Sequence, residues 1–409
     1  MLYSLIKYLD SLFTIPGARL FQYQTFRATL AIVLSLIIAI WLGGKIINTL
    51  KKHQIGESVR NLGLDGQIQK TGTPTMGGLL ILLSTLCPVL LICKLDNIYI
   101  QLLLTASVWC GLLGFLDDYI KVFKHNKKGL KGWFKVFGQI GLGLIIGCTM
   151  CFSDNVVVRE KSNQEPSSTT IQMSISNTTT PSQGHDVRNA KTTIPFVKNN
   201  EFDYGWFTNH NKTLTDALYI LVAIFIVVFL SNGANLTDGL DGLCTGVSIP
   251  IIVVLGILAY LSGNINYADY LNIMYIPSSG EMIVFASAMV GALIGFMWYN
   301  SFPAQIFMGD TGSLAIGGII AAFSLCLRKE LLIPLMCGIF LLESLSVTLQ
   351  VAYFKHTKKK YGEGRRIFLM TPIHHHYQKK GLHEVKIMMR FTIVSIILCA
   401  ISFITLKIR

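Results

Sequence analysis

Apolar residues gather in about ten runs along this chain, and polar segments separate each run from the next. Most runs hold roughly 17 to 25 residues, the length that an α-helix needs to cross the hydrocarbon core of a bilayer. Helices satisfy their backbone hydrogen bonds within one segment, as lipid requires. The pattern predicts an all-α, polytopic integral membrane protein with about ten transmembrane helices, at 27–47, 76–93, 98–116, 134–152, 213–232, 244–262, 282–299, 313–327, 330–353 and 386–407.

Two stretches lie outside this pattern. The first twenty residues are broken by polar residues and a proline, and they predict an interfacial helix and not a removed signal peptide. Segment 153–212 predicts a polar external loop inserted into one transmembrane domain that spans 1–409. Its middle, 167–183, is too polar to bury a core and is expected to be disordered. Its aromatic end, FDYGWF (202–207), is expected to lie at the membrane interface.

Composition agrees with a membrane protein. Apolar residues make up 52% of the chain, charged residues make up 14%, and the mean hydropathy is +0.53. These values lie outside the usual range for a soluble domain. The net charge of +13 suits a face that meets anionic lipid headgroups or phosphorylated substrates. Nucleic acid is a poor partner for this chain, because no separate soluble basic domain exists.

Orientation follows from the lysine and arginine residues, because short cytoplasmic loops keep positive charge. Twenty-one of the 35 basic residues lie in three polar segments, 43–75, 117–135 and 354–390. Ten spans would place all three segments on one face. We therefore expect that face to be cytoplasmic and both termini to be periplasmic, although three basic residues near the N-terminus argue weakly for the reverse.

Two adjacent aspartates stand at the end of one apolar run. Asp117 and Asp118 follow an uncharged stretch at 102–116, and Lys121 comes shortly after them. An isolated carboxylate in hydrocarbon costs at least ~2.5 kcal/mol, so this pair must be solvated, paired or metal-bound. The pair therefore predicts a functional site at the membrane's edge.

Two further acidic clusters fall on the same expected face. In NGANLTDGLDG (232–242), Asp238 and Asp241 share one side if the segment is helical, and the glycines allow a ligand to approach the backbone. The alternative is a Gly-Asn turn capped by aspartate. In WYNSFPAQIFMGDTGS (298–313), Asn300 lies in the turn, Phe307 could stack on a planar ring, and Asp310 could bind a metal or serve as a helix N-cap.

The last basic segment contains His374, His375 and His376. Three contiguous histidines cannot all face one way on a helix, which argues against a zinc site built from this triplet alone. Phosphate contacts or proton handling suit them better. Together with five aspartates on the same face, they favour phosphoryl transfer, which uses Mg2+ bound by carboxylates and cations that spread the phosphate charge.

Five segments resemble, in the same order, the motifs of the phospho-N-acetylmuramoyl-pentapeptide transferase family. The resemblance covers nearly the whole chain except 153–212, and the triple histidine fits this family better than the related sugar-1-phosphate transferases that share the acidic motifs. The segments are KTGTPTMGG (70–78), GFLDDYIKV (114–122), NLTDGLDGL (235–243), FMGDTGSLA (307–315) and TPIHHHYQKKG (371–381).

This resemblance implies a bacterial inner-membrane enzyme. It would transfer phospho-MurNAc-pentapeptide from UDP-MurNAc-pentapeptide to undecaprenyl phosphate, forming lipid I and UMP with Mg2+. Its active site would be cytoplasmic, its partners would be these substrates and membrane lipids, and a homodimer stays open. Spacing does not decide between a covalent intermediate and direct attack by the lipid phosphate, and direct attack is favoured.

The resemblance also implies residue roles. Asp310 would be the principal Mg2+ ligand, and Asp117 a second ligand and candidate base, with Asp118 beside it and His374 also catalytic. The implied substrate-binding residues are Lys70, Lys121, Asn235, Asp238, Asp241, Asn300, Phe307, His375 and His376.

Other functions remain as alternatives. A related transferase would use UDP-GlcNAc as the donor to polyprenyl phosphate. An ion-coupled transporter would bury ionisable residues near the midplane, but only Glu343 lies well inside a long span, where we expect a polar contact with Ser344 or Ser346. A non-catalytic scaffold would not explain five aspartates on one face.

Overall fold

The computed structural model of the chain describes residues 2–13, 17–52, 70, 72–124, 129–161, 184–187, 190–194 and 201–406. Helices dominate these residues, as the apolar runs predict. The helices are α1 (Leu2–Phe13), α2 (Gln24–Lys52), α3 (Gly78–Ile92), α4 (Ile98–Phe123), α5 (Gly132–Phe152), α6 (Lys212–Thr237), α7 (Leu243–Ser262), α8 (Ile265–Leu271), α9 (Met282–Asn300), α10 (Gly309–Cys326), α11 (Ile333–Met336), α12 (Gly338–Tyr361), α13 (Ile373–Lys379) and α14 (Glu384–Thr405).

Short elements complete the fold. Four 3-10 helices are η1 (Ala18–Gln22), η4 (Tyr204–Phe207), η5 (Ser279–Glu281) and η6 (Glu330–Leu332). Four strands form two antiparallel pairs in which β1 (Val158–Lys161) pairs with β2 (Gly184–Val187), and β3 (Lys191–Thr193) pairs with β4 (Glu201–Asp203).

Eight helices in the described chain are long and apolar enough to cross a membrane: α2, α4, α5, α6, α7, α9 with η5, α10 and α14. A ninth candidate is the pair formed by Glu330–Met336 and α12, which meet at 78°. The predicted span over 330–353 is therefore broken into two helices, and the length of the apolar run alone did not locate the bend. The run at 76–93 forms α3, whose 15 residues measure about 22 Å, less than a full bilayer core.

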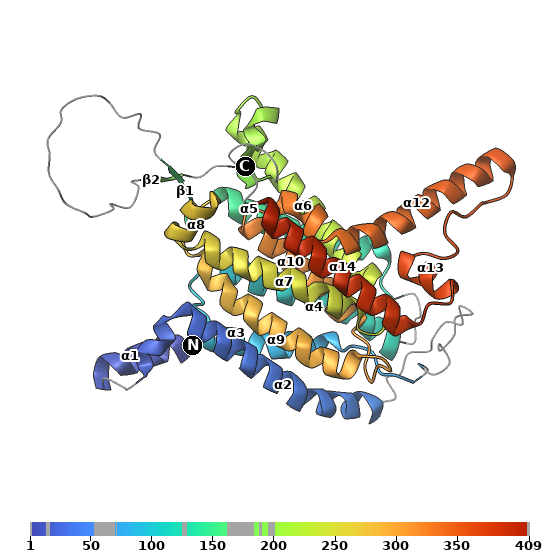
Figure 1. Ribbon diagram of the computed structural model, residues 1–409, viewed down its shortest axis with the longest axis horizontal. Coiled ribbons are helices and arrows are strands. Elements are labelled where there is room, and N and C mark those ends of the chain that lie inside the picture. Colours follow the sequence, from blue (N-terminus) through green and yellow to red (C-terminus); the bar gives the residue numbers. More distant parts are fainter. Residues whose placement is uncertain are drawn as a thin grey trace.

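α10 lies at the centre of the bundle. Side chains are buried over 89% of its apolar window, against 28% for α2, which lies at the edge in Figure 1. It packs against α3, α4, α6 and α7, while α9 packs against α2, α3 and α7. These helices carry apolar residues on all sides, as helices in a buried core or in a membrane do. The first turn of α10 is therefore held on several sides.

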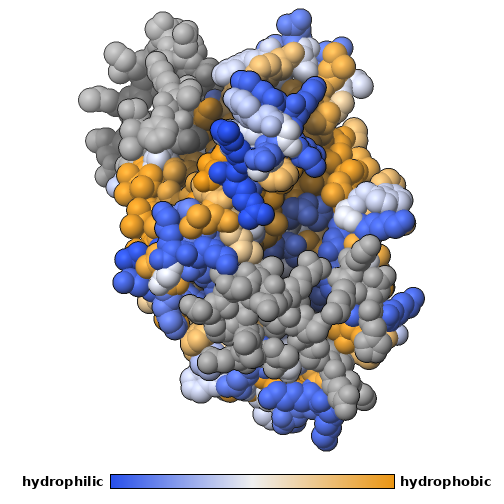
Figure 2. Space-filling view, turned by 90° about the vertical axis from the view of Figure 1, so that its right-hand side faces the viewer, coloured by the Kyte–Doolittle hydropathy of each residue, from blue (hydrophilic) through white to orange (hydrophobic). Residues whose placement is uncertain are grey.

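The two ends of the bundle differ. Figure 1 shows both chain termini toward one end and α13 toward the other, where α12 also projects from the bundle. Figure 2 looks onto that second end. Hydrophilic side chains lie near the middle of this face, and hydrophobic side chains lie beside them. We call it the aspartate end, because Asp117, Asp118 and Asp310 lie there.

Part of the predicted external loop is ordered and packed. Thr192 and Thr193 of β3 are buried, and the Thr193 amide donates to the carbonyl of Arg328, just after α10 (2.9 Å). The composition of the loop does not indicate this contact, because its partner, Arg328, is far away in the sequence. The predicted disorder at 167–183 concerns residues outside the described ranges.

Candidate active site

Three aspartates from two helices meet at the aspartate end. Asp117 and Asp118 lie near the end of α4, and Asp310 lies in the first turn of α10. One carboxylate oxygen from each lies within 4.8 Å of the others. Asp117 and Asp118 are buried, whereas the side chain of Asp310 stays 14% exposed. The cluster therefore opens towards solvent on the Asp310 side.

Asp118 holds the start of α10. Its carboxylate accepts hydrogen bonds from the Asp310 amide (3.1 Å), the Thr311 amide (2.9 Å) and the Thr311 hydroxyl (2.6 Å). Helix N-termini leave such amides unpaired and favour negative charge. The alternative role of Asp310 as N-cap is therefore wrong, because Met308 occupies that position and Asp118 supplies the acceptor from another helix.

A glycine lets α4 and α10 approach closely enough for this contact. A Cβ on Gly114 would fall inside the van der Waals radii of the Asp310 carbonyl and of Thr311 Cα. Gly309, which begins α10, has a φ of +72°, a conformation that glycine adopts without penalty. The glycines of both motifs therefore set the positions of the aspartates.

Two lysines bridge Asp117 and Asp310. Lys121 Nζ lies 2.6 Å from Asp117 Oδ2 and 3.2 Å from Asp310 Oδ2. Lys135 Nζ, from α5, lies 3.0 Å from Asp117 Oδ2 and also contacts Asp310 Oδ2. The other Asp117 oxygen accepts from the Leu130 amide (2.6 Å). Three carboxylates face two ammonium groups, so the cluster has charge left to attract a further cation.

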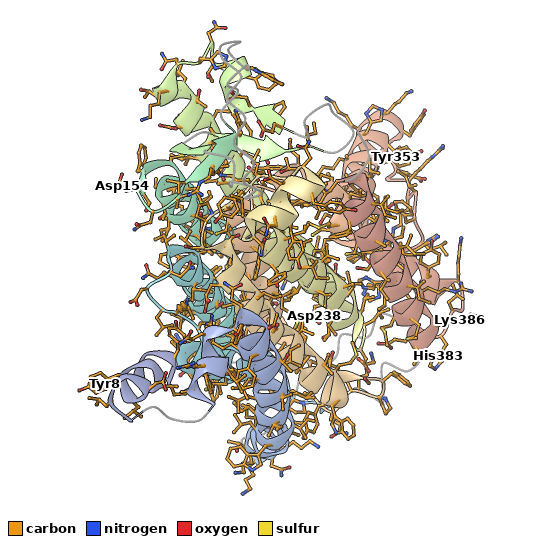
Figure 3. All side chains as sticks on the ribbon, turned by 60° about the vertical axis from the view of Figure 1, so that its left-hand side comes forward. Tyr8, Asp154, Asp238, Tyr353, His383 and Lys386 are labelled. Carbon is orange, nitrogen blue, oxygen red and sulfur yellow. The ribbon has the colours of Figure 1, made fainter. Side chains whose placement is uncertain are left out.

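Asn235 fixes the remaining oxygen of Asp310. Its Nδ2 donates to Asp310 Oδ1 (2.9 Å) and to Ser313 Oγ (2.9 Å). This contact brings the end of α6 to the cluster. Asp238 comes next, as the C-terminal cap of α6, and Figure 3 labels it at the lower end of that helix.

A second polar cluster forms around Lys70. Its Nζ lies 2.7 Å from Asp241 Oδ1 and 2.5 Å from Glu384 Oε1. Asp241 Oδ2 accepts from the amide of Ala304 (3.0 Å). Close by, Asn300 Oδ1 accepts from the amide of Gly242 (3.0 Å). Of the predicted residues, Lys70 and Asp241 are thus in contact, Asn300 lies beside them, and Glu384 joins the cluster.

Backbone pairing connects the two clusters. The Phe307 amide donates to the Pro74 carbonyl, and the amides of Gly77 and Gly78 donate to the carbonyls of Phe307 and Met308, each at 2.8 Å. The segment that begins at Lys70 therefore lies along the segment that leads into Asp310. Phe307 is half-buried between them.

The three histidines point to three different partners. His374 is fully buried, and its Nδ1 lies 3.1 Å from Glu343 Oε1, which is also fully buried. The expected polar contact between Glu343 and Ser346 is present only through the backbone, and the Glu343 carboxylate lies against His374. Ser346 donates instead to the backbone carbonyl of Glu343 (2.7 Å). The sequence favoured a nearby serine because it does not show that α13 folds back against α12 and brings His374 to Glu343.

The other two histidines make local contacts. His375 Nδ1 pairs with Gln378 Oε1 (2.7 Å), and His376 Nδ1 accepts from the Leu369 amide (3.1 Å). Burial, with smaller contributions from His374 and Lys70, lowers the pKa of His375 from 6.5 to about 4. His375 is therefore neutral at pH 7.

Three residues in these clusters were not identified as site residues from the sequence. Lys135 is one of many lysines in a basic segment, and nothing local marks it as the one that reaches Asp310. Glu384 begins α14, where an acidic residue also suits a helix N-terminus. Thr311 lies inside a motif, but the motif pointed to its neighbour Asp310 as the site residue. Only long-range packing distinguishes these three residues.

The site combines a cluster of three carboxylates with two neighbouring ammonium groups. Both oxygens of Asp118 are engaged by the start of α10, so Asp310 is the carboxylate on the solvent-exposed side, and the buried Asp117 is linked to it through Lys121 and Lys135. Such a donor set suits a hard cation better than a soft one. The arrangement can bind a metal ion and an anionic ligand together.

Comparison with known proteins agrees with this arrangement. Residues 100–328 match the model of glycosyl transferase family 4, and residues 70–82 match signature 1 of phospho-N-acetylmuramoyl-pentapeptide-transferase. Proteins with that same name are 56% identical in Flavobacterium psychrophilum, 55% in Flavobacterium johnsoniae and 51% in Porphyromonas gingivalis, over the full length of both chains. The chain therefore belongs to the phospho-N-acetylmuramoyl-pentapeptide-transferase family.

Proposed function

We propose that this protein transfers phospho-MurNAc-pentapeptide from UDP-MurNAc-pentapeptide to undecaprenyl phosphate. The products are UMP and lipid I, a lipid-linked precursor in peptidoglycan biosynthesis. The curated relatives carry the name of this transferase along their whole length. The observation that carries the proposal in the structure is the meeting of Asp117, Asp118 and Asp310 beside Lys121 and Lys135.

The metal in this proposal is Mg2+. Asp117 and Asp310 would hold it, because Mg2+ takes one or two carboxylates together with waters and phosphate oxygens. When bound, Mg2+ would neutralise charge on the diphosphate of the donor. Lys121 and Lys135 would then contact phosphate oxygens, since their ammonium groups already lie at the same carboxylates.

The chain's own groups supply orientation and proton handling. In this proposal Asp117 positions the acceptor phosphate or takes its proton, and that phosphate attacks the donor directly. Asp118 keeps the first turn of α10 in place, and Asn235 orients Asp310. His374, oriented by Glu343, is buried next to the Lys70 side of the site.

The Lys70 cluster is proposed to bind the nucleotide end of the donor. Lys70, Asp241 and Asn300 offer hydrogen bonds for uracil, ribose or phosphate, and Phe307 offers a ring for stacking on a planar base. Asp238, His375 and His376 complete the proposed substrate contacts. Backbone pairing keeps this cluster in register with Asp310.

The proposal includes a topology. The aspartate end would face the cytoplasm of a bacterial inner membrane, because the basic segments lie there, and ten spans would leave both termini and the loop at 153–212 in the periplasm. The whole chain would act as one transmembrane catalytic domain. A homodimer through lipid-facing helices stays a prediction.

Donor selectivity tests the proposed function. Purified protein receives undecaprenyl phosphate, Mg2+ and either UDP-MurNAc-pentapeptide or UDP-GlcNAc, and released UMP is measured. We expect release from the muropeptide donor only. Release from UDP-GlcNAc alone would assign the chain to the related GlcNAc-1-phosphate transferases, and release from neither by folded protein would reject the transfer reaction.

A further inference from the structure

A buried cation lies at the end of the bundle opposite the aspartates. The 18 residues of α10, Gly309–Cys326, span about 27 Å, with Asp310 at the start. Just beyond that helix, Arg328 is only 4% exposed. Figure 3 marks the same end with Asp154, just beyond α5, while Asp238 marks the aspartate side. We call this the far end.

The guanidinium of Arg328 is incompletely paired. It lies over the ring of Tyr219, 4.6 Å from the centroid, and its Nη2 donates to the Met150 carbonyl at 3.4 Å. Its Nε and Nη1 have no hydrogen-bond partner within the described ranges. A buried, charged donor without a hydrogen-bond partner is destabilising. The buried Glu330 carboxylate interacts electrostatically with this guanidinium, but Nε and Nη1 still lack a hydrogen-bond acceptor within the described ranges.

A cavity of about 300 Å³ adjoins this arginine. Its wall contains two cations, Arg328 and Lys212, and two carboxylates, Asp203 and Asp216. Asp203 Oδ1 already accepts from the Gly205 amide (2.7 Å), so its role is partly structural. A wall with both signs of charge matches a ligand that carries an anionic and a cationic group a few ångströms apart.

Exposed apolar residues stand next to cavity residues in the sequence, and we call them the apolar rim. Phe152, Trp206, Phe207 and Leu214 are 56% to 73% exposed and neighbour cavity residues along the chain. α5 and α6, which contribute to the wall, are both only 33% buried within their spans and so face lipid. Exposed aromatic residues at the ends of such helices are typical of headgroup depth. The cavity therefore lies beside two lipid-facing helices, near the depth expected for lipid headgroups.

We propose that this cavity binds the headgroup of a zwitterionic phospholipid. The phosphate would accept from Arg328 and Lys212, and the ammonium would donate to Asp216 and Asp203. The acyl chains would lie along the apolar rim. This assignment would satisfy the unpaired nitrogens of Arg328, and it does not depend on the transfer reaction at the aspartate end.

Native mass spectrometry of the purified, delipidated full-length protein tests this site. Phosphatidylethanolamine, phosphatidylglycerol or soluble glycerophosphoethanolamine is added at equal concentration. We expect one tightly bound phosphatidylethanolamine per chain, at least tenfold weaker phosphatidylglycerol, and no competition by the soluble compound. Equal affinity for phosphatidylglycerol would overturn the zwitterionic assignment, and full competition by glycerophosphoethanolamine would overturn the lipid assignment.

Variants locate the binding. Lys212→Gln and Asp216→Asn change partly exposed wall residues, so they should fold, and each should weaken phosphatidylethanolamine about tenfold or more. Lys94→Gln and Asp269→Asn remove charges outside the cavity wall and serve as matched controls. UMP release at the wild-type rate verifies folding in all four. Unchanged affinity in both wall variants would reject the site, even if Arg328→Gln failed to fold.

Discussion

At the scale of single residues, Asp310 has the most demanding surroundings. Asn235 and two lysines contact its carboxylate, yet the group keeps 14% of its surface exposed. Asp310→Asn keeps the size of the side chain but removes the charge that would hold Mg2+. UMP release should fall by roughly 10³-fold or more, with an unchanged melting temperature. Substantial turnover in the folded variant would contradict the metal assignment.

Lys135 provides a test of a residue that the motifs did not reveal. Lys135→Gln removes the ammonium group shared by Asp117 and Asp310, and it should lower kcat by roughly 10²-fold. Lys131→Gln is the matched control, since Lys131 is exposed at the start of the same helix and loses the same charge. Equal effects of the two substitutions on steady-state UMP release would show that only general charge matters.

His375 gives a pH prediction for stability. Its folded-state pKa, about 4, lies below the ordinary 6.5, so the unfolded chain binds the proton more tightly between these values. The free energy of unfolding therefore contains a contribution that is lost as the pH falls from about 6.5 towards 4. Melting temperatures at pH 7 and pH 5 should differ less in His375→Gln than in wild type. His356→Gln, at an exposed histidine of α12, should keep the wild-type difference.

At the scale of elements, the crossing of α4 and α10 positions the three aspartates. Gly114→Ala places a methyl group against the Asp310 carbonyl, which must move. We expect a loss of about 1–3 kcal/mol in the free energy of unfolding together with reduced turnover. Gly132→Ala, at a helical glycine with open space around it, is the control. Thermal unfolding and UMP release of both variants measure the effect, and wild-type behaviour of Gly114→Ala would contradict the close crossing.

The element scale also shows what the sequence could predict. Apolar runs located the membrane helices, because burial in lipid leaves a long and simple signal. They gave no sign of the 78° bend before α12, since both arms are apolar. Five motifs named Asp310 and Lys70, but they left out Glu384 and Lys135. Those two residues become recognisable only when α14 and α5 bring them to the site.

At the scale of the whole molecule, we propose different roles for the two ends of the bundle. Replacing 162–183 by Asn-Gly should leave turnover within about twofold, because Lys161 and Gly184 are opposite each other in β1 and β2 and a two-residue turn can join them. Deleting 190–194 should lower the melting temperature, because it removes the partners of Arg328 and Lys329. UMP release and thermal unfolding measure both outcomes. Loss of turnover in a folded 162–183 replacement would show that this segment serves catalysis.

The proposed reaction transfers a group from the donor to the acceptor lipid. The most direct measurement follows UMP and the lipid-linked muropeptide together in purified protein, with the acceptor lipid, the donor or Mg2+ omitted in turn. For the proposed transfer we expect equal amounts of both products when all three are present, and neither product when any one is missing. UMP release without undecaprenyl phosphate, or without formation of the lipid-linked product, would contradict it.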